Sequence, residues 1–228
     1  MVSAVAGSGS SGRLGMMVLV GLDPGGADAF GWCLVEDKSS PPLRVRAAGV
    51  ADDAGAAVDA VERAAAGVDI AGAGIDAPMF WTTSGDRAVD KYVRTAICKL
   101  GASGGTVGHV NSLRGACLVQ GMVAATMLRR KNPQLPVTEA HPKAALWMLG
   151  EATKTRRVSG ITTSALAQYF DVGTHAMASD HERDAALGAL TTWAMLHRAT
   201  GWKDIRGRDP NAVSPLVAPV GYWVPVTT

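Results

Sequence analysis

The sequence predicts an α/β fold with a mixed five-stranded sheet, in which three antiparallel strands precede two parallel crossover strands, flanked by helices. Three apolar segments joined by short breaks open the chain, which favours antiparallel pairing between them. Helical and extended segments then alternate, as they do in parallel crossover units. A chain of 228 residues can bury one large core, so we expect a single domain.

The expected strands are short apolar segments bounded by turn residues. The first is a continuous apolar run, typical of a strand covered on both faces. Strands are expected at residues 16–22, 29–36, 42–50, 69–76 and 135–140. Helices are expected at residues 54–67, 113–130, 143–150, 161–170 and 180–200, from their apolar spacing and their stop signals.

The remaining segments divide the chain into a leader, one domain over 16–228, an insertion and a tail. Residues 1–15 are rich in Gly and Ser, which indicates a flexible leader or a start codon assigned upstream of Met16. Their G-x-G-x-x-G pattern has no strand before it and no helix after it, so it does not indicate a dinucleotide site. Residues 79–112 are expected to be an insertion, partly helical, over the carboxyl ends of the strands. The proline-containing tail from about residue 201 is expected to run extended over the surface.

Composition excludes several classes of protein. The formal net charge of +2 is not that of a global polycation, so any nucleic-acid binding must come from local patches. The cysteines, Cys33, Cys98 and Cys117, are widely separated, which indicates reduced and mostly buried thiols in a cytoplasmic protein. No apolar run reaches the ~18 residues of a membrane span, and residues 1–15 do not resemble a signal peptide.

Acidic residues occur where a site would be built. Asp23, Asp76 and Glu139 each stand at the carboxyl end of an expected strand, the edge where open α/β sheets carry their sites. Asp184 lies inside an otherwise apolar helix, where an unpartnered carboxylate is costly. Any one of them has a simpler explanation, since Asp23-Pro-Gly is also turn chemistry.

Four carboxylates that converge repel one another unless a cation neutralises them. Oxygen ligands without cysteine suggest Mg²⁺ or Mn²⁺. Two such ions about 3.5–4 Å apart can activate water and stabilise the leaving oxygen in phosphodiester hydrolysis. Asp180 and His181 share a helix face with Asp184, and Asp180 is expected to be the N-cap of that helix.

Several motifs together resemble a known family. The stretches VGLDPGGADAFGW, GIDAP, GDRAVDKYVR, VTEAHP, DHERDAALGALTTWA and GYWVP, from about Val18 to Pro225, are similar to the predicted nucleases of domain-of-unknown-function family 429. That family has a ribonuclease H-like fold and is distantly similar to Holliday-junction resolvases of the RuvC kind.

The resemblance implies a nuclease with two metal ions, a nucleic-acid substrate and, because those resolvases are dimers, a homodimer. It implies that the acids are both catalytic residues and metal ligands, joined by His181 as a further ligand: Asp23, Asp76, Glu139 and Asp184. Two departures stand against it. Ribonuclease H takes one acid from its first helix, where this chain offers only Asp59 and Glu62, and the resolvases have glutamate where this chain has Asp76.

Basic and aromatic residues are the candidates for substrate binding. Arg87, Lys91 and Arg94 are spaced along one helical face and suit contacts with phosphate, or alternatively a solvated face paired with nearby aspartates. Lys154 belongs to a basic loop that offers a second phosphate contact. Trp81 either stacks on a base or packs within its loop.

Two other functions fit parts of the sequence. An actin-like ATPase or sugar kinase shares the opening strand–Asp–Gly turn–strand, but Asp76-Ala-Pro stands where a second glycine-rich phosphate loop would be expected. A non-catalytic nucleic-acid or protein-binding member of the ribonuclease H-like fold would keep the architecture without turnover. The four acids favour the nuclease.

Overall fold

The first three strands form an antiparallel meander, as predicted. The computed structural model describes residues 16–82, 86–108, 115–152, 166–173 and 177–227. Strand β1 (Met17–Asp23) pairs with β2 (Phe30–Glu36), and β2 pairs with β3 (Leu43–Ala51). Residues 24–29 connect β1 to β2, and the pairing sets Asp23 opposite Gly31.

The two predicted crossover strands are also present. Helix α1 (Ala54–Ala65) leads to β4 (Asp69–Ile75), which runs parallel to β1. Strand β5 (Val137–Glu139) runs parallel to β4 on its other side. Adjacent parallel strands end at the same edge of a sheet, so β1, β4 and β5 deliver their last residues to one region.

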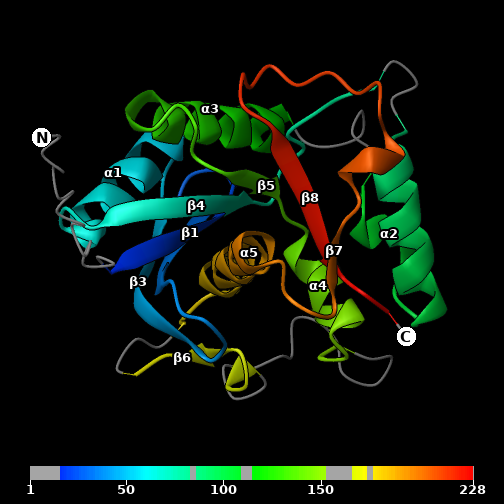
Figure 1. Ribbon diagram of the computed structural model, residues 1–228, viewed down its shortest axis with the longest axis horizontal. Coiled ribbons are helices and arrows are strands. Elements are labelled where there is room, and N and C mark those ends of the chain that lie inside the picture. The colour runs from blue at the N-terminus through cyan, green and yellow to red at the C-terminus, as the bar shows by residue number, and fades with distance from the viewer. Residues whose placement is uncertain (1–15, 83–85, 109–114, 153–165, 174–176, 228) are drawn as a thin grey trace, which may run out of the picture.

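The sheet has eight strands, so the prediction of five was wrong in number. Its order is β6-β3-β2-β1-β4-β5-β8-β7 (Figure 1). The additional strands are β6 (Phe170–Asp171), β7 (Trp202–Asp204) and β8 (Val220–Pro225).

Two of these strands lie in the tail. The tail was expected to cover the surface, but β8 pairs parallel to β5 and buries Tyr222 and Val224 completely or nearly so. Phe170 of β6 pairs with Leu43 of β3, so the helix predicted over 161–170 is wrong at its end. Residues 161–165 lie outside the described part of the chain. Both errors concern short strands whose pairing partners are distant in sequence.

The helices cover the two faces of the sheet and its edge. Figure 1 shows α5 (Asp180–His197) against one face and α1 with α3 (Gly115–Lys131) against the other. The insertion contains α2 (Ala88–Lys99) and the 3-10 helix η1 (Gly104–Thr106), and α4 (Pro142–Met148) follows β5. A second 3-10 helix, η5 (Arg206–Arg208), precedes β8.

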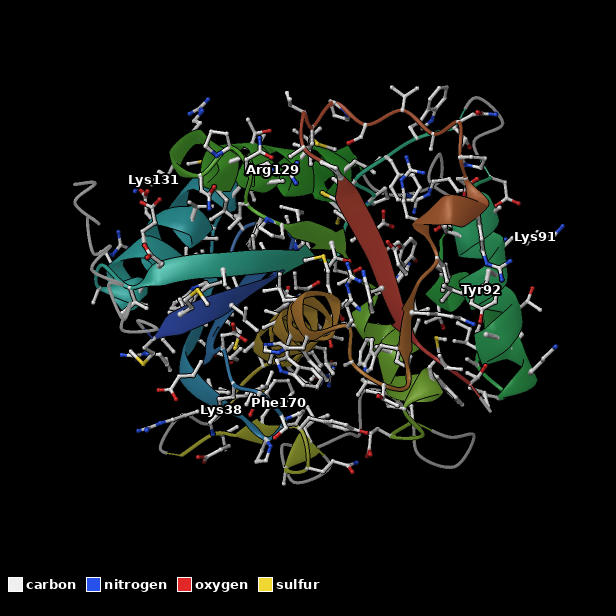
Figure 2. All side chains as sticks on the ribbon, in the orientation of Figure 1. Lys38, Lys91, Tyr92, Arg129, Lys131 and Phe170 are labelled. Carbon is white, nitrogen blue, oxygen red and sulfur yellow. The ribbon has the colours of Figure 1, made fainter. Side chains whose placement is uncertain are left out.

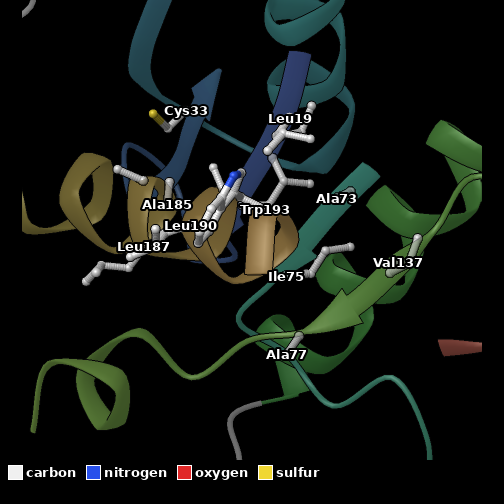
Figure 3. Packing of buried hydrophobic residues seen from close by; sticks show 14 of the residues in the cluster. Leu19, Cys33, Ala73, Ile75, Ala77, Val137, Ala185, Leu187, Leu190 and Trp193 are labelled. Carbon is white, nitrogen blue, oxygen red and sulfur yellow. The ribbon is translucent and has the colours of Figure 1, made fainter. Parts of the chain in front are cut away.

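Glycines let α5 approach the sheet very closely. A Cβ added at Gly21 would lie 1.6 Å from the carbonyl oxygen of Ala185, and one at Gly74 would lie 2.1 Å from that of Gly188. Both contacts are shorter than any side chain tolerates, so only glycine fits there. Leu19 of β1 and Leu190 of α5 belong to the hydrophobic core around this contact (Figure 3).

Two further sequence predictions can be compared with the structure. The cysteines are free thiols, but only Cys33 is buried; Cys98 is exposed and Cys117 is half-buried. Within the described ranges, no helix has the length and apolar character needed to cross a membrane.

Candidate active site

The N-terminus of α5 stands over the carboxyl end of β1. Ser179 is its N-cap and forms a capping box with Glu182, in which each side chain bonds the other residue's backbone N–H. Asp180 is therefore the first helical residue rather than the predicted cap. The close packing at Gly31, where a Cβ would lie 2.2 Å from the carbonyl oxygen of His181, fixes this helix end on the sheet.

Asp23 and Asp76 end two adjacent parallel strands on the α5 side of the sheet. Each stands two residues after a glycine that faces α5, so strand alternation directs both carboxyl groups to that side. The backbone N–H of Asp76 donates to the carbonyl of Leu22, which extends the pairing to the site. Oδ2 of Asp23 lies 2.9 Å from Nδ1 of His181.

Burial and mutual repulsion raise the pKa of both carboxyls. Burial, followed by the charges of Asp76 and Asp184, raises the pKa of Asp23 to about 7, against the hydrogen bond from His181. Burial and then the charge of Asp184 raise the pKa of Asp76 to about 7 as well. Lys143 opposes both shifts, so its ammonium lies close to the pair. A pair of acids with raised pKa values in a cleft is typical of functional sites.

Asp184 joins the two aspartates but is fully buried and paired. Its Oδ2 accepts a 2.6 Å bond from Nζ of Lys143, and its Oδ1 accepts bonds of 3.0 and 2.8 Å from Nε and Nη2 of Arg183. Burial alone would lower the pKa of Lys143, but Asp184, Asp23 and Asp76 together raise it. The lysine is therefore a fixed positive charge within the cluster.

Glu139, the fourth predicted acid, faces away from α5. The register pairs Glu139 with Ile75, one residue before Asp76, and Ile75 lies on the α3 side, next to Gly121. Alternation along a strand puts neighbouring side chains on opposite faces, so Glu139 and Asp76 point to different faces of the sheet, although both line the same cavity.

A buried arginine neutralises Glu139. Nη2 and Nη1 of Arg87 donate to Oε1 and Oε2 of Glu139 at 2.6 and 2.8 Å, and Arg87 also bonds both oxygens of Asp90. The N–H of Met79 donates to Oε2 as well. The structure therefore brings Asp23, Asp76 and Asp184 together, and leaves Glu139 in an adjacent ion pair.

Sequence reasoning missed His141 and Lys143. Nδ1 of His141 lies 3.6 Å from Oδ1 of Asp76, and burial lowers the pKa of His141. Lys143 had not been considered. Their position immediately after β5, at the same edge as the acids, was the signal that could have identified them.

These residues line a cavity of about 650 Å³. Its walls come from the ends of β1, β4 and β5, from the η1 segment and from the beginnings of α4 and α5. A larger cavity of about 960 Å³ lies at the opposite ends of the strands, but its acids include Glu62 and Asp37, which pair with Lys131 and His197. We place the site in the smaller cavity because its aspartates have raised pKa values and converge.

The predicted substrate-binding residues are placed in different ways. Arg87, Lys91 and Arg94 do not form one exposed basic face: Arg87 is buried at the N-cap of α2, whereas Lys91 projects outward (Figure 2). Arg94 is half-buried and bonds Asp86 and the carbonyl of Val107.

Trp81 is 45% exposed and lines an apolar cavity of about 700 Å³ that shares Pro78 with the site. Its backbone pairs with Val213 of the tail, which holds the ring at this position. Lys154 lies outside the described residues.

The donor set fits one divalent cation better than two. Asp23 and Asp76 offer oxygens at the cavity, whereas both oxygens of Asp184 and of Glu139 already bond cationic side chains. Over the described part of the chain, no group of three or more His, Cys, Asp or Glu side chains is arranged to hold a metal ion.

Comparisons of the chain with family models, with curated proteins and with solved structures found no match.

Proposed function

We propose that this chain is a nuclease that hydrolyses a phosphodiester bond of a nucleic acid with the help of Mg²⁺ or Mn²⁺. The observation that carries the proposal is that Asp23, Asp76 and Lys143 line one cavity, where Lys143 bonds the buried Asp184 beneath it. Acids with raised pKa values at the carboxyl ends of parallel strands suit a centre that is completed by a cation. The resemblance of the motifs to a nuclease family supports the same chemistry.

Asp23 and Asp76 are the residues that would hold the cation. A divalent ion bound there would lower the pKa of a water molecule and stabilise charge on the phosphoryl oxygens. The raised pKa values mean that both carboxyls must lose a proton before they act as ligands, so the site favours neutral or higher pH.

His181 is placed to handle a proton. When Asp23 is ionised, Nδ1–H of His181 donates to Oδ2 of Asp23 and leaves Nε2 as an acceptor. The half-exposed imidazole lines the cavity, so Nε2 is the chain's own group for taking a proton from an attacking water.

The surroundings of the cavity suit a polyanion with aromatic bases. Lys143 places a positive charge at the reaction centre, and Lys91 offers one on the outer surface of the insertion. Trp81 is exposed and lines the apolar cavity that adjoins the site through Pro78, where an unstacked base could lie against its ring. Arg87 supports Glu139 rather than phosphate in this proposal.

A panel of nucleic acids tests the proposal. Branched DNA, duplex DNA, single-stranded DNA and an RNA–DNA hybrid are incubated with Mg²⁺ or Mn²⁺, and cleavage of at least one is expected. Asp23→Asn should lower the rate at least about 100-fold while the fold survives. Asp69→Asn, at the opposite end of β4, is the matched control and should retain the rate.

A second candidate is a nucleic-acid-binding protein without turnover. It is favoured by the ion pairs that neutralise Glu139 and Asp184, two of the four predicted catalytic acids. Retained binding of a panel member without cleavage under either metal would select this candidate over the nuclease.

A further inference from the structure

Lys143 occupies the centre of the acidic cluster. It is the second residue of α4, four residues after the end of β5, and its ammonium reaches α5. Nζ donates to Oδ2 of Asp184 at 2.6 Å. Its side chain is 47% exposed, so the stem lies along the cavity while the charged end bonds a carboxylate that is fully buried.

The remaining oxygen of Asp184 is engaged from within the helix. Arg183 is 4% exposed and donates to Oδ1 through both Nε and Nη2, and its Nη1 bonds Asp180 at 2.7 Å. A buried arginine in a forked contact of this kind holds its carboxylate firmly. Asp184 therefore enters the cluster already neutralised by two fixed cations.

Glu139 cannot replace Asp184 as a ligand. Both of its oxygens bond the guanidinium of Arg87, and the register turns its side chain to the other face of the sheet. A second divalent ion beside the first would need oxygens from one of these two acids. It would also have to approach the ammonium of Lys143, which repels it.

We infer that the site takes one divalent cation, on Asp23 and Asp76, and that Lys143 supplies the positive charge that a second ion would bring. This inference rests on the proposed function, and it departs from the two-ion centre that the motifs predict. Lys143 then acts as a positioning residue: it holds Asp184 and keeps a charge next to the place where a phosphate would lie.

Counting bound Mn²⁺ tests the inference without any activity assay. The wild type, K143M and K143R are titrated with MnCl₂, and the ions bound per chain are measured by electron paramagnetic resonance of free Mn²⁺ and by calorimetry. We expect about one ion per chain for the wild type and about two for K143M, because Oδ2 of Asp184 then becomes available. K143R keeps the charge and should bind about one.

Three controls make the count interpretable. K91M removes an exposed lysine of α2 and should leave the count unchanged. D76N should abolish the ion bound by the wild type, because it removes one of the two carboxylates that hold it. Thermal melting establishes that each variant is folded. If K143M does not fold, K143Q takes its place.

The outcomes separate this inference from the proposed function. Two ions on the wild type would overturn the single-ion inference, and one ion on both the wild type and K143M would overturn the role of Lys143; either result leaves the nuclease proposal standing. No Mn²⁺ on any variant would overturn both. One ion on the wild type and two on K143M, with one on K143R, supports the role of Lys143.

Discussion

At the scale of single residues, the site combines three aspartates with nearby cationic side chains that neutralise only one of them. Lys143 and Arg183 neutralise Asp184, while Asp23 and Asp76 keep raised pKa values because burial and repulsion outweigh the nearby lysine. With pKa values of about 7, these two carboxyls bind protons close to neutral pH in the absence of a metal. Their protonation should therefore be visible in the stability of the protein.

We expect the free energy of unfolding, measured in EDTA, to depend on pH because of the raised pKa values of Asp23 and Asp76. An acid whose pKa is about 7 in the folded state and about 4 in the unfolded state stabilises the fold fully below pH 4. That contribution falls as pH rises from about 4 to 7, because the unfolded state ionises over this interval while the folded state still holds its proton. Asp76→Asn removes the contribution, so the variant should gain about 2–4 kcal/mol relative to the wild type across this interval.

Urea unfolding at a series of pH values measures the difference. Asp69→Asn, an exposed change on the same strand, should run parallel to the wild type at every pH. A constant difference between Asp76→Asn and the wild type from pH 4 to 7 would contradict the raised pKa.

At the scale of elements, the site depends on how closely α5 lies on β1 and β4. The glycines at positions 21 and 74 let the helix backbone touch the strands, and this contact brings Asp184 and His181 to the aspartates. The capping box at Ser179 fixes where the helix begins. Small shifts of α5 would separate residues that come from three different elements.

Gly21→Ala should therefore be strongly destabilising. The added methyl group would overlap the carbonyl of Ala185, which belongs to the helix backbone and cannot rotate away. We expect a loss of about 3 kcal/mol or more in the free energy of unfolding. Chemical denaturation of Gly21→Ala and of Gly207→Ala, where no atom lies within 4 Å of the new Cβ, provides the measurement. Equal stability of the two variants would show that α5 can move away from the sheet at little cost.

At the scale of the whole molecule, the insertion and the tail are tied to the sheet around the site. Arg87 links the start of α2 to Glu139 of β5, and the carboxylate of Asp209 in the tail accepts from the N–H groups of Ala88 and Val89. Arg129 of α3 donates to the carbonyls of Ala218 and Pro219, just before β8. The wall of the cavity is thus built from segments far apart in sequence.

Arg87→Met should break this assembly at its centre. It leaves Glu139 and Asp90 as buried carboxylates without their cation, a change that costs about 3–5 kcal/mol when a buried pair is broken. Arg44→Met is the control, because Arg44 is 65% exposed and lies 4.0 Å from Glu36, and it should change stability by less than about 1 kcal/mol. Denaturation curves give the free energy of unfolding of the two variants. A small effect of Arg87→Met would show that the buried ion pair contributes little to the stability of the fold.

The sequence by itself determined the meander, the two crossover strands, the covering helices and the edge of the sheet where Asp23, Asp76 and Asp184 meet. These features follow from local signals: apolar runs, turn residues and the rule that parallel strands end at one edge. Strands β8 and β6 could not be predicted, because their pairing depends on partners more than eighty residues away, and β7 pairs in turn with β8.

Only the tertiary structure decided which acids are not paired with a cationic side chain of an arginine or lysine. The register of β5 turned Glu139 to the other face, and the ion pairs of Arg87, Arg183 and Lys143 are made across separate elements or inside a buried helix end. A sequence gives the position of an acid along a strand, but not the cation that folding brings to it. Side-chain direction and charge pairing are set by packing, and at this site they select Asp23 and Asp76 from the four candidates.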